Sequence, residues 1–324
     1  MSEAVAATRA QNVRAQGYLI CISATFAWAF TGIMIRYLTV NFQLPPLVLA
    51  FWRDVFVASA LALVFLFTNR KRLILERRHL RFLVLYGLVL VLFNSLWTFS
   101  VALNGAAVST VLAYSSSAFT ALLAWWLLKE SLHLPKIVAV SLGLLGCIFV
   151  SGAYNLAEWA VNPFGILTGI CSGMAFAAYS LMGKYTANRQ INSWSALLYS
   201  FAFAGVFFLP LNLITTALQG QAALPTLFWL GKSALGWAVL IGLAVGPTIG
   251  GYGLYTLSLN YLPASVANLI AMLEPVITAV LAFFLLGEWM TPPQLFGGAL
   301  IISSVVIIRI FETRQSLPET VAPA

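Results

Sequence analysis

The residues of this sequence that could do chemistry are few, and they lie within or just beside long apolar runs. Glu274 stands immediately before Pro275, near the middle of one run. A carboxyl group at that depth in an apolar phase is costly unless it faces a cavity or a partner. One interpretation is a proton- or ammonium-responsive group at a substrate site. The other is local, because proline removes a backbone hydrogen bond and a neighbouring polar group helps to satisfy what is freed.

Four more charged residues occupy positions from which a role can be inferred. Arg53 and Asp54 lie eight or nine residues into another apolar run. Adjacent residues of a helix do not face one another, so we expect each to bond a neighbouring helix instead. Glu130 and Glu288 follow the ends of two runs, just before proline-containing turns. There a carboxylate can accept hydrogen bonds from the N-terminus of the next helix, which predicts a structural role.

Glycine recurs at every fourth position in two of the runs. The two series are Gly165, Gly169 and Gly173, and Gly242, Gly246 and Gly250. Such spacing lets helix backbones approach closely. Because Pro247 also interrupts the second run near its middle, Gly246, Pro247 and Gly250 are hinge candidates; tight static packing is an equal alternative.

Several kinds of chemistry are disfavoured. The two histidines, His79 and His133, fall in predicted loops, so no Ser-His, Cys-His or metal cluster can be built within the apolar runs. The segment 231–233 (GKS) lacks the upstream glycine of a phosphate-binding loop. We therefore expect no catalytic residue, no metal, no cofactor and no ATPase subunit.

The elements that position these residues are predicted to be membrane spans. Only 8% of the 324 residues are charged and 61% are hydrophobic, whereas a soluble domain carries roughly a quarter charged residues. A span needs about 20 apolar residues. Cutting the chain at charges, Pro, Asn and Gly gives ten segments, at 17–38, 45–68, 81–103, 106–129, 135–153, 163–185, 193–215, 234–258, 263–286 and 293–311.

The basic residues predict the orientation. With the N-terminus inside, 14 of the 17 Lys and Arg fall on the inner side, and only Arg36, Arg53 and Lys232 do not. This bias is typical of multi-pass proteins of the cell (inner) membrane and predicts cytoplasmic tails over 1–16 and 312–324. The basic loop 69–81 is then expected to face anionic lipid and not nucleic acid.

The two halves of the chain, 17–153 and 163–311, repeat one another. Segment 106–130 shares ten of 25 positions with 264–288, including Glu130 with Glu288, and the same shift aligns Pro135 with Pro293. Because each half has five helices, the second half must enter the membrane upside down. Inverted repeats with a site between them are the recurring plan of secondary transporters.

A family resemblance rests on the same elements. The stretch LEPVITAVLAFFLLGEWMTPPQLFGGALIIS (273–303) resembles the signature of EamA-type permeases of the drug/metabolite transporter superfamily, with its counterpart at 116–146. The stretch FWRDVFVASALAL (51–63) is similar to that family's second helix, and ten-helix length and aromatic-rich spans resemble the YddG-like amino acid exporters most. The resemblance implies an all-α membrane fold: helices 1, 3, 4, 6, 8 and 9 surround a central cavity, and 2, 5, 7 and 10 lie outside them.

The resemblance also bears on single residues. It presents Glu-Pro as a family feature across different substrates, which favours a structural or gating role for Glu274 and Pro275. The peripheral place of helix 2 favours a structural role for Arg53 and Asp54. The chain departs from the pattern at 116–117, where Ser-Ser stands against Glu-Pro, so the two halves are not expected to be equivalent there.

Polar and aromatic side chains at helical spacing on the six inner helices are the candidates for a substrate cavity. Carrier sites are mostly apolar with a few placed polar groups, although aromatics are also ordinary core residues and interface anchors in membranes. The candidates are Trp28, Asn94, Trp97, Thr110, Tyr114, Phe176, Tyr179, Tyr252, Tyr255, Asn268 and Met272.

The sequence therefore predicts a secondary transporter that exports amino acids, aromatic and other neutral ones, or related small metabolites by alternating access. The first alternative is a carrier of another cargo, such as a drug or a nucleotide sugar. A phosphate-bearing cargo would favour a basic cavity, yet Arg53 is the only basic residue deep in a span. A channel-like pore is a further alternative, but no filter motif is present. A membrane enzyme is the third. The expected partners are a small-molecule substrate and the lipid bilayer.

Overall fold

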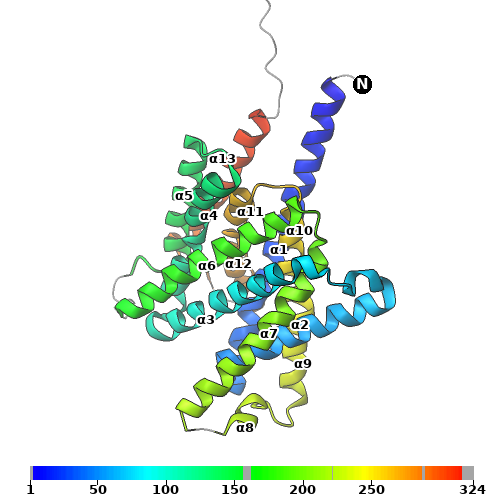
Figure 1. The fold of residues 1–324 in the computed structure, drawn as a ribbon. Helices are drawn as coiled ribbons and strands as arrows, with labels where there is room; N and C mark the ends of the chain where they lie inside the picture. The colour runs from blue at the N-terminus through cyan, green and yellow to red at the C-terminus, as the bar shows by residue number, and fades with distance from the viewer. Residues whose placement is uncertain (1–2, 156–161, 221, 287–288, 316–324) are drawn as a thin grey trace, which may run out of the picture.

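The computed structural model describes residues 3–155, 162–220, 222–286 and 289–315. Those residues are almost entirely helical, and no strand occurs among them (Figure 1). Ten helices are long and apolar enough to cross a membrane, from Asn12–Phe42 to Pro292–Glu312. Each coincides with one of the predicted segments to within a few residues, so the prediction of an all-helical, ten-span fold is confirmed.

The first half contains spans one to five. Its elements are α1 (Glu3–Phe42), α2 (Pro46–Thr68), the short η1 (Arg70–Leu73), α3 (Arg77–Tyr114), α4 (Ser116–Leu128) and α5 (Leu134–Ser151). The second half contains spans six to ten. Its elements are α6 (Pro163–Asn188), α7 (Ser193–Leu218), α8 (Ala223–Leu227), α9 (Ala234–Leu243), η3 (Ala244–Thr248), α10 (Ile249–Ser258), α11 (Ala264–Ala271), α12 (Glu274–Leu286) and α13 (Pro292–Gln315).

Local sequence explains where several helices begin and end. Pro46 and Pro163 occupy the first position of α2 and α6, where a missing N–H costs nothing. The side chains of Asn162 and Asn192 accept hydrogen bonds from the first backbone N–H groups of α6 and α7. At the other end of α5, Gly152 has a φ of 80°, which ends the helix in the left-handed conformation.

The two halves are interrupted at corresponding places. Span four breaks between α3 and α4 at Ser115, and span nine breaks between α11 and α12 at residues 272–273. These positions align under the 158-residue shift that relates the repeats. The break therefore survives the replacement of Glu-Pro by Ser-Ser at 116–117, which shows that proline is not its only cause.

The first glycine series packs tightly, and the second does not. A Cβ added at Gly173 would lie 2.9 Å from the carbonyl oxygen of Leu112, so α6 meets α3 almost backbone to backbone. A Cβ at Gly246 would meet nothing within 4 Å, and one at Gly250 would lie 3.5 Å from the Cβ of Ala27. The second series is thus not explained by close packing.

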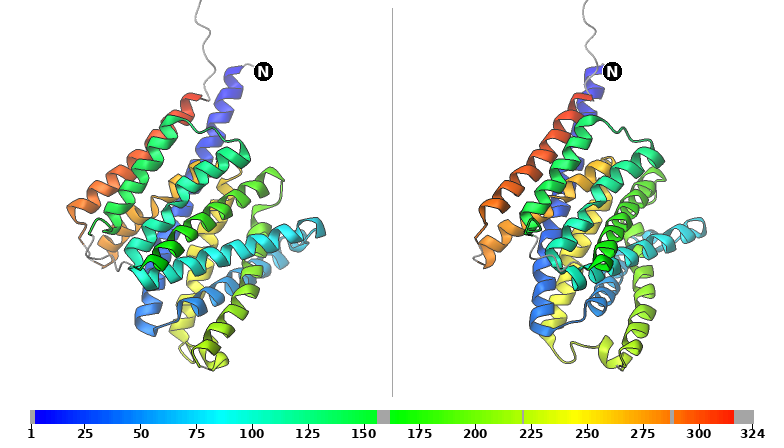
Figure 2. Two further views of the ribbon diagram at one scale, coloured as in Figure 1. Left: turned by 60° about the vertical axis from the view of Figure 1, so that its left-hand side comes forward. Right: turned by 90° about the vertical axis from the view of Figure 1, so that its left-hand side faces the viewer.

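The arrangement of the helices brings distant segments together. Figures 1 and 2 show α5 beside α13, α3 across α6, and the N-terminus and the end of α13 at the same end of the molecule. Apolar side chains point outward along much of the surface; Phe67, Leu218 and Phe284 are 83%, 83% and 75% exposed. Such a surface requires an apolar surrounding, as a bilayer provides.

Candidate functional site

Five of the predicted cavity residues form one aromatic cluster between the halves. Trp28 of α1 lies with its ring centroid 5.1 Å from Tyr252 and 5.1 Å from Tyr255, both of α10. Phe176 of α6 lies 6.1 Å from Trp28, and Tyr179, one turn later, lies 5.6 Å from Tyr252. These five residues are called the central aromatic cluster below. All are buried, so in this conformation they fill the space between α1, α6 and α10.

Three more rings extend the cluster, and the sequence reasoning missed them. Tyr86 and Phe93 of α3 stack on Tyr179 and Phe176 at 4.6 and 4.9 Å, and Phe201 of α7 lies 5.2 Å from Tyr252. Nothing in the sequence distinguishes these rings from the other aromatics of their apolar runs. Only the rotation of each helix about its axis selects them.

Asn268 lies beside the cluster and is engaged by the protein itself. Its side-chain oxygen accepts a hydrogen bond from Ser116 at 3.1 Å, and its amide donates to Ser180 at 3.2 Å. The Ser180 and Tyr255 hydroxyls are in turn 2.7 Å apart. This chain of polar groups joins α4, α11, α6 and α10 in the molecular interior, so it ties the first half to the second.

Glu274 makes a second contact between the halves. The hydroxyl of Tyr114, at the end of α3, donates to the Glu274 carboxylate at 2.9 Å. The two residues flank the two helix interruptions. Buried Met272 lies against α5, because a Cβ added at Gly143 would meet its sulfur at 2.8 Å.

The remaining predicted cavity residues are less closely joined. Trp97 and Thr110 are half-buried and lie outside the ring contacts given above. Asn94 is 8% exposed. Among the described residues, the Asn94 side-chain amide nitrogen and the Trp28 indole N–H are buried without a hydrogen-bond partner. Buried polar groups without a partner are rare in folded interiors, so each calls for an explanation.

The prediction that Arg53 and Asp54 bond other helices is wrong. Arg53 Nε donates to Asp54 Oδ1 at 3.1 Å, and both side chains are buried within α2 and its neighbours. The side chains leave the helix about 100° apart, yet the long arginine bends back to reach the adjacent carboxylate. In an apolar interior the nearest opposite charge outweighs the geometric preference of the helix surface.

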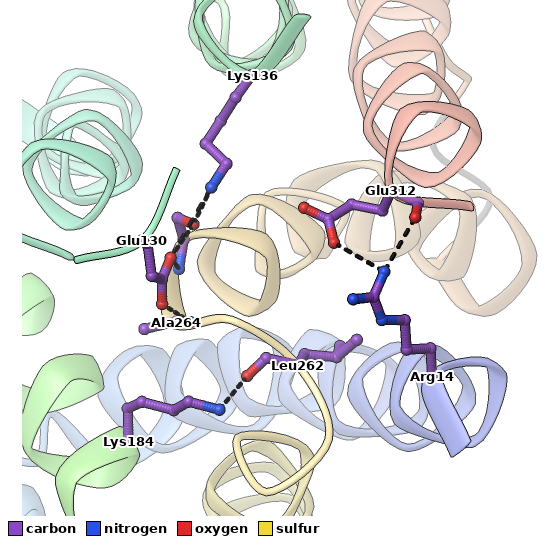
Figure 3. A network of polar contacts seen from close by, with 8 residues as sticks. Arg14, Glu130, Lys136, Lys184, Leu262, Ala264 and Glu312 are labelled. Carbon is purple, nitrogen blue, oxygen red and sulfur yellow. Dashed lines mark hydrogen bonds and ion pairs between the residues drawn. The ribbon is translucent and has the colours of Figure 1, made fainter. Parts of the chain in front are cut away.

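Glu130 accepts hydrogen bonds from the N-terminus of a helix, as predicted, but that helix is not the next one in the sequence. Its carboxylate accepts hydrogen bonds from the backbone N–H of Ala264 at 2.7 Å and from the Ser265 hydroxyl (Figure 3). These groups begin α11 in the second half, not the helix that follows Glu130 in sequence. Lys136 of α5 completes the group, donating to Ser265 at 3.0 Å and pairing with Glu130 at 3.8 Å. Glu288, its repeat counterpart, lies outside the described residues.

Two more polar contacts join helices at the same end of the molecule. Lys184 of α6 donates to the backbone oxygens of Leu259 and Leu262, both at 2.8 Å. Arg14 of α1 pairs with Glu312 of α13 at 3.5 Å (Figure 3). Polar contacts thus join several helices at this end.

Gly246 and Pro247 lie in a wider helical turn. Span eight continues through them as the π-helical η3, and the Thr248 hydroxyl donates to the Leu243 carbonyl at 2.8 Å. This bond helps to satisfy backbone that the proline leaves unpaired. An apolar crevice of about 410 Å³ adjoins the turn, lined by Phe26, Ala27, Phe30, Met34, Gly246 and Pro247.

The sequence of this chain is similar to those of known transporters. The sequence model of the EamA-like transporter family matches the chain twice, over residues 15–152 and 163–310. A transporter of Archaeoglobus fulgidus is 28% identical over 56% of this chain, which spans 59% of that relative's length. The inner membrane transporter YicL of Salmonella typhimurium is 23% identical over 93% of this chain and 97% of its own.

One further relative has a substrate in its name, and one protein of known structure has a similar fold. An S-adenosylmethionine uptake transporter of Rickettsia prowazekii is 24% identical over 72% of this chain and 73% of its own. A protein of known crystal structure superposes with a TM-score of 0.74 at 16% identity, covering 93% of this chain and 99% of the other. At that identity the likeness establishes the fold alone.

Proposed function

Since the chain belongs to the EamA-like transporter family, a family of membrane carriers, we propose that it is a secondary transporter that exports amino acids by alternating access. Aromatic and other neutral amino acids, or closely related metabolites, are its cargo, as in the YddG-like exporters. It works in the cell (inner) membrane with both termini in the cytoplasm. It is a carrier and not an enzyme, channel or ATP-driven pump.

The observation that carries this proposal is the central aromatic cluster. It lies where helices of both halves meet, beside the Asn268 chain and the Tyr114–Glu274 contact. Aromatic rings give an amino acid side chain area to contact, and unpaired buried donors on Trp28 and Asn94 could bind a carboxylate. Release requires modest affinity, about 4 kcal/mol for a millimolar dissociation constant.

In this proposal the observed conformation is closed at the cytoplasmic end. Glu130, Lys184 and Arg14 join helices of different parts of the chain there. The cluster would separate when the halves rock, and span eight would bend at Gly246 and Pro247. Support for a hinge comes from the π-turn and from the open space beside Gly246.

The test is transport by the purified protein in proteoliposomes, with and without a proton gradient. The panel contains aromatic, branched, small and charged amino acids, together with a nucleotide sugar. We expect saturable exchange of aromatic and branched amino acids and none of the nucleotide sugar. Exchange confined to phosphate-bearing compounds would contradict the proposal.

The rickettsial relative suggests a second cargo, S-adenosylmethionine. This compound carries the same α-amino-carboxylate head group as an amino acid, together with an adenine ring that aromatic side chains can stack on. Adding it to the panel separates the two candidates. A strong preference for it over phenylalanine would replace amino acids as the main cargo.

A further inference from the structure

The pair Arg53 and Asp54 is incompletely bonded in a place where charges are costly. Arg53 is 6% exposed and Asp54 is 0% exposed. Apart from the single bond that joins them, Arg53 Nη2 and Asp54 Oδ2 are buried without a partner among the residues that the structure describes. One donor of a guanidinium and one acceptor of a carboxylate are thus both left unused, one residue apart.

Stability does not account for this arrangement. A buried ion pair gains less than it loses in hydration unless further hydrogen bonds complete it. Each buried polar atom without a partner costs about 1–3 kcal/mol, and more when it is charged. Two apolar residues would fill the same volume without either penalty. The pair is therefore better explained by a ligand that it binds than by packing.

The helix of this pair packs next to the central aromatic cluster. It is α2, which packs against α7 and η3. Phe201 of α7 contacts Tyr252 of the cluster, and η3 continues directly into α10, which carries Tyr252 and Tyr255. The helix that the family resemblance placed at the periphery thus lies against elements that carry rings of the proposed site.

We propose that Arg53 and Asp54 bind the head group of a zwitterionic α-amino acid, with Arg53 Nη2 donating to its carboxylate and Asp54 Oδ2 accepting from its ammonium. The side chain of the ligand then lies against the central aromatic cluster. A zwitterion supplies a hydrogen-bond partner to Arg53 Nη2 and to Asp54 Oδ2 at the same time, and it adds no net charge to the interior. An anion or a cation of the same size would supply a partner to one of these atoms and leave the other without one, so the site selects zwitterions.

This inference rests on the proposed function, and the experiment separates the two. Three probes share one ring: L-phenylalanine, its amide, which lacks the carboxylate, and 3-phenylpropionate, which lacks the ammonium. Binding is measured by ligand-induced thermal stabilisation in detergent, and transport by exchange in proteoliposomes. The variants are Arg53→Met with Asp54→Leu, Asp54→Asn alone, and, as the matched control, Arg78→Met with Glu76→Leu, an exposed ion pair at the start of α3.

We expect the intact protein to bind phenylalanine roughly tenfold or more tightly than either analogue. The apolar double variant at 53 and 54 should fold, because such replacements of buried pairs are tolerated, and lose this preference together with phenylalanine exchange. Asp54→Asn should weaken phenylalanine binding more than 3-phenylpropionate binding. The control pair, whose side chains are exposed outside the proposed site, should behave as the intact protein does.

Different failures have different meanings. If the double variant exchanges phenylalanine with unchanged affinity, the pair is structural and only this inference is overturned. If the double variant does not fold, Asp54→Asn decides, and equal losses for all three probes would reject the site. If the intact protein binds and carries no zwitterion of the panel, the proposed function and the site are rejected together.

Discussion

At the scale of single residues, Glu130, Glu274 and the pair Arg53 and Asp54 all contact other polar groups, but they differ in how completely their hydrogen bonds are made. Glu130 is saturated by Ala264, Ser265 and Lys136, whereas Arg53 and Asp54 share one bond. Glu274 is intermediate, with the Tyr114 hydroxyl as its donor. A charged group whose hydrogen bonds are all made stabilises the fold, whereas one with an unused donor or acceptor can still bind a ligand.

Glu274→Gln should retain much of the transport, with little change in its dependence on a proton gradient. The amide oxygen can still accept the hydrogen bond from Tyr114, so the contact between the halves persists. Tyr114→Phe removes the donor and should cost about 1–3 kcal/mol of stability. Exchange in proteoliposomes and thermal unfolding in detergent measure the two effects. Loss of gradient-driven transport in a folded Glu274→Gln protein would instead identify Glu274 as the proton-coupling group.

Tyr252→Ala and Trp97→Ala should change which amino acids are carried before they change the yield of folded protein. Tyr252 contributes ring contacts to three aromatic neighbours, and its loss should weaken the binding of large substrates by about 1–3 kcal/mol relative to small ones. Phe67→Ala is the control, because that ring is 83% exposed on the outer surface. Unchanged substrate preference in both variants would place the cavity elsewhere.

At the scale of elements, the helices differ in what holds them. The contact between α6 and α3 depends on the absence of side chains, the start of α11 depends on a carboxylate from the loop after α4, and span eight contains a π-turn with open space beside it. Rigid contacts and a deformable turn thus occur in different spans. A carrier needs both, because rigid bodies must move about a few flexible points.

Two glycine substitutions test the packing difference. Gly173→Ala should lower stability by about 1–3 kcal/mol, since the new methyl group would meet the Leu112 carbonyl at 2.9 Å. Gly250→Ala should be neutral or slightly stabilising, because the methyl would lie 3.5 Å from Ala27 and alanine favours helix. Both glycines are helical, so each is a control for the other. Thermal unfolding in detergent gives the comparison, and equal effects would refute the packing argument.

Glu130→Gln should loosen the end of the molecule that carries the termini. The neutral amide loses the charge-assisted bonds to α11 and the pairing with Lys136, for a cost of about 1–3 kcal/mol. Glu312→Gln breaks a partly exposed pair and should cost no more than about 1 kcal/mol. Stability measurements on the two variants decide. A larger loss for Glu312→Gln would mean that Glu130 does not hold the two halves together.

At the scale of the whole molecule, two five-helix halves of opposite orientation form one body. The start of α1 and the end of α13 lie at the same end of it, as an even number of spans requires (Figure 2). The Glu130 and Arg14 contacts at that end and the polar contacts in the interior run between the halves. Their relative motion, and not the bending of one helix alone, is thus the expected route for cargo.

The orientation is tested with single cysteines in a protein whose native cysteines are replaced. Ile74→Cys is suited because that side chain is 71% exposed beside η1, and a second cysteine is placed at the C-terminus. Both should react with a membrane-impermeant reagent only from the cytoplasmic side, as the basic loop requires. Reaction of either from the outside would overturn the predicted orientation.

The sequence by itself determined the spans, their approximate bounds and the inverted repeat. These are local properties, because a bilayer of fixed thickness demands about 20 apolar residues and complete backbone hydrogen bonding within each span. It also identified five rings of the central aromatic cluster from their spacing. It could not separate them from Met272, which the structure places against α5.

Only the tertiary structure decided which polar groups meet. Tyr114 and Glu274 are 160 residues apart, and Glu130 caps a helix that begins 134 residues later. Such contacts depend on how far each helix is rotated about its axis, which an apolar run leaves open because lipid and core accept the same residues. The pairing of Arg53 with Asp54 has the same origin: both side chains are buried, and the adjacent opposite charges bonded despite the helix geometry.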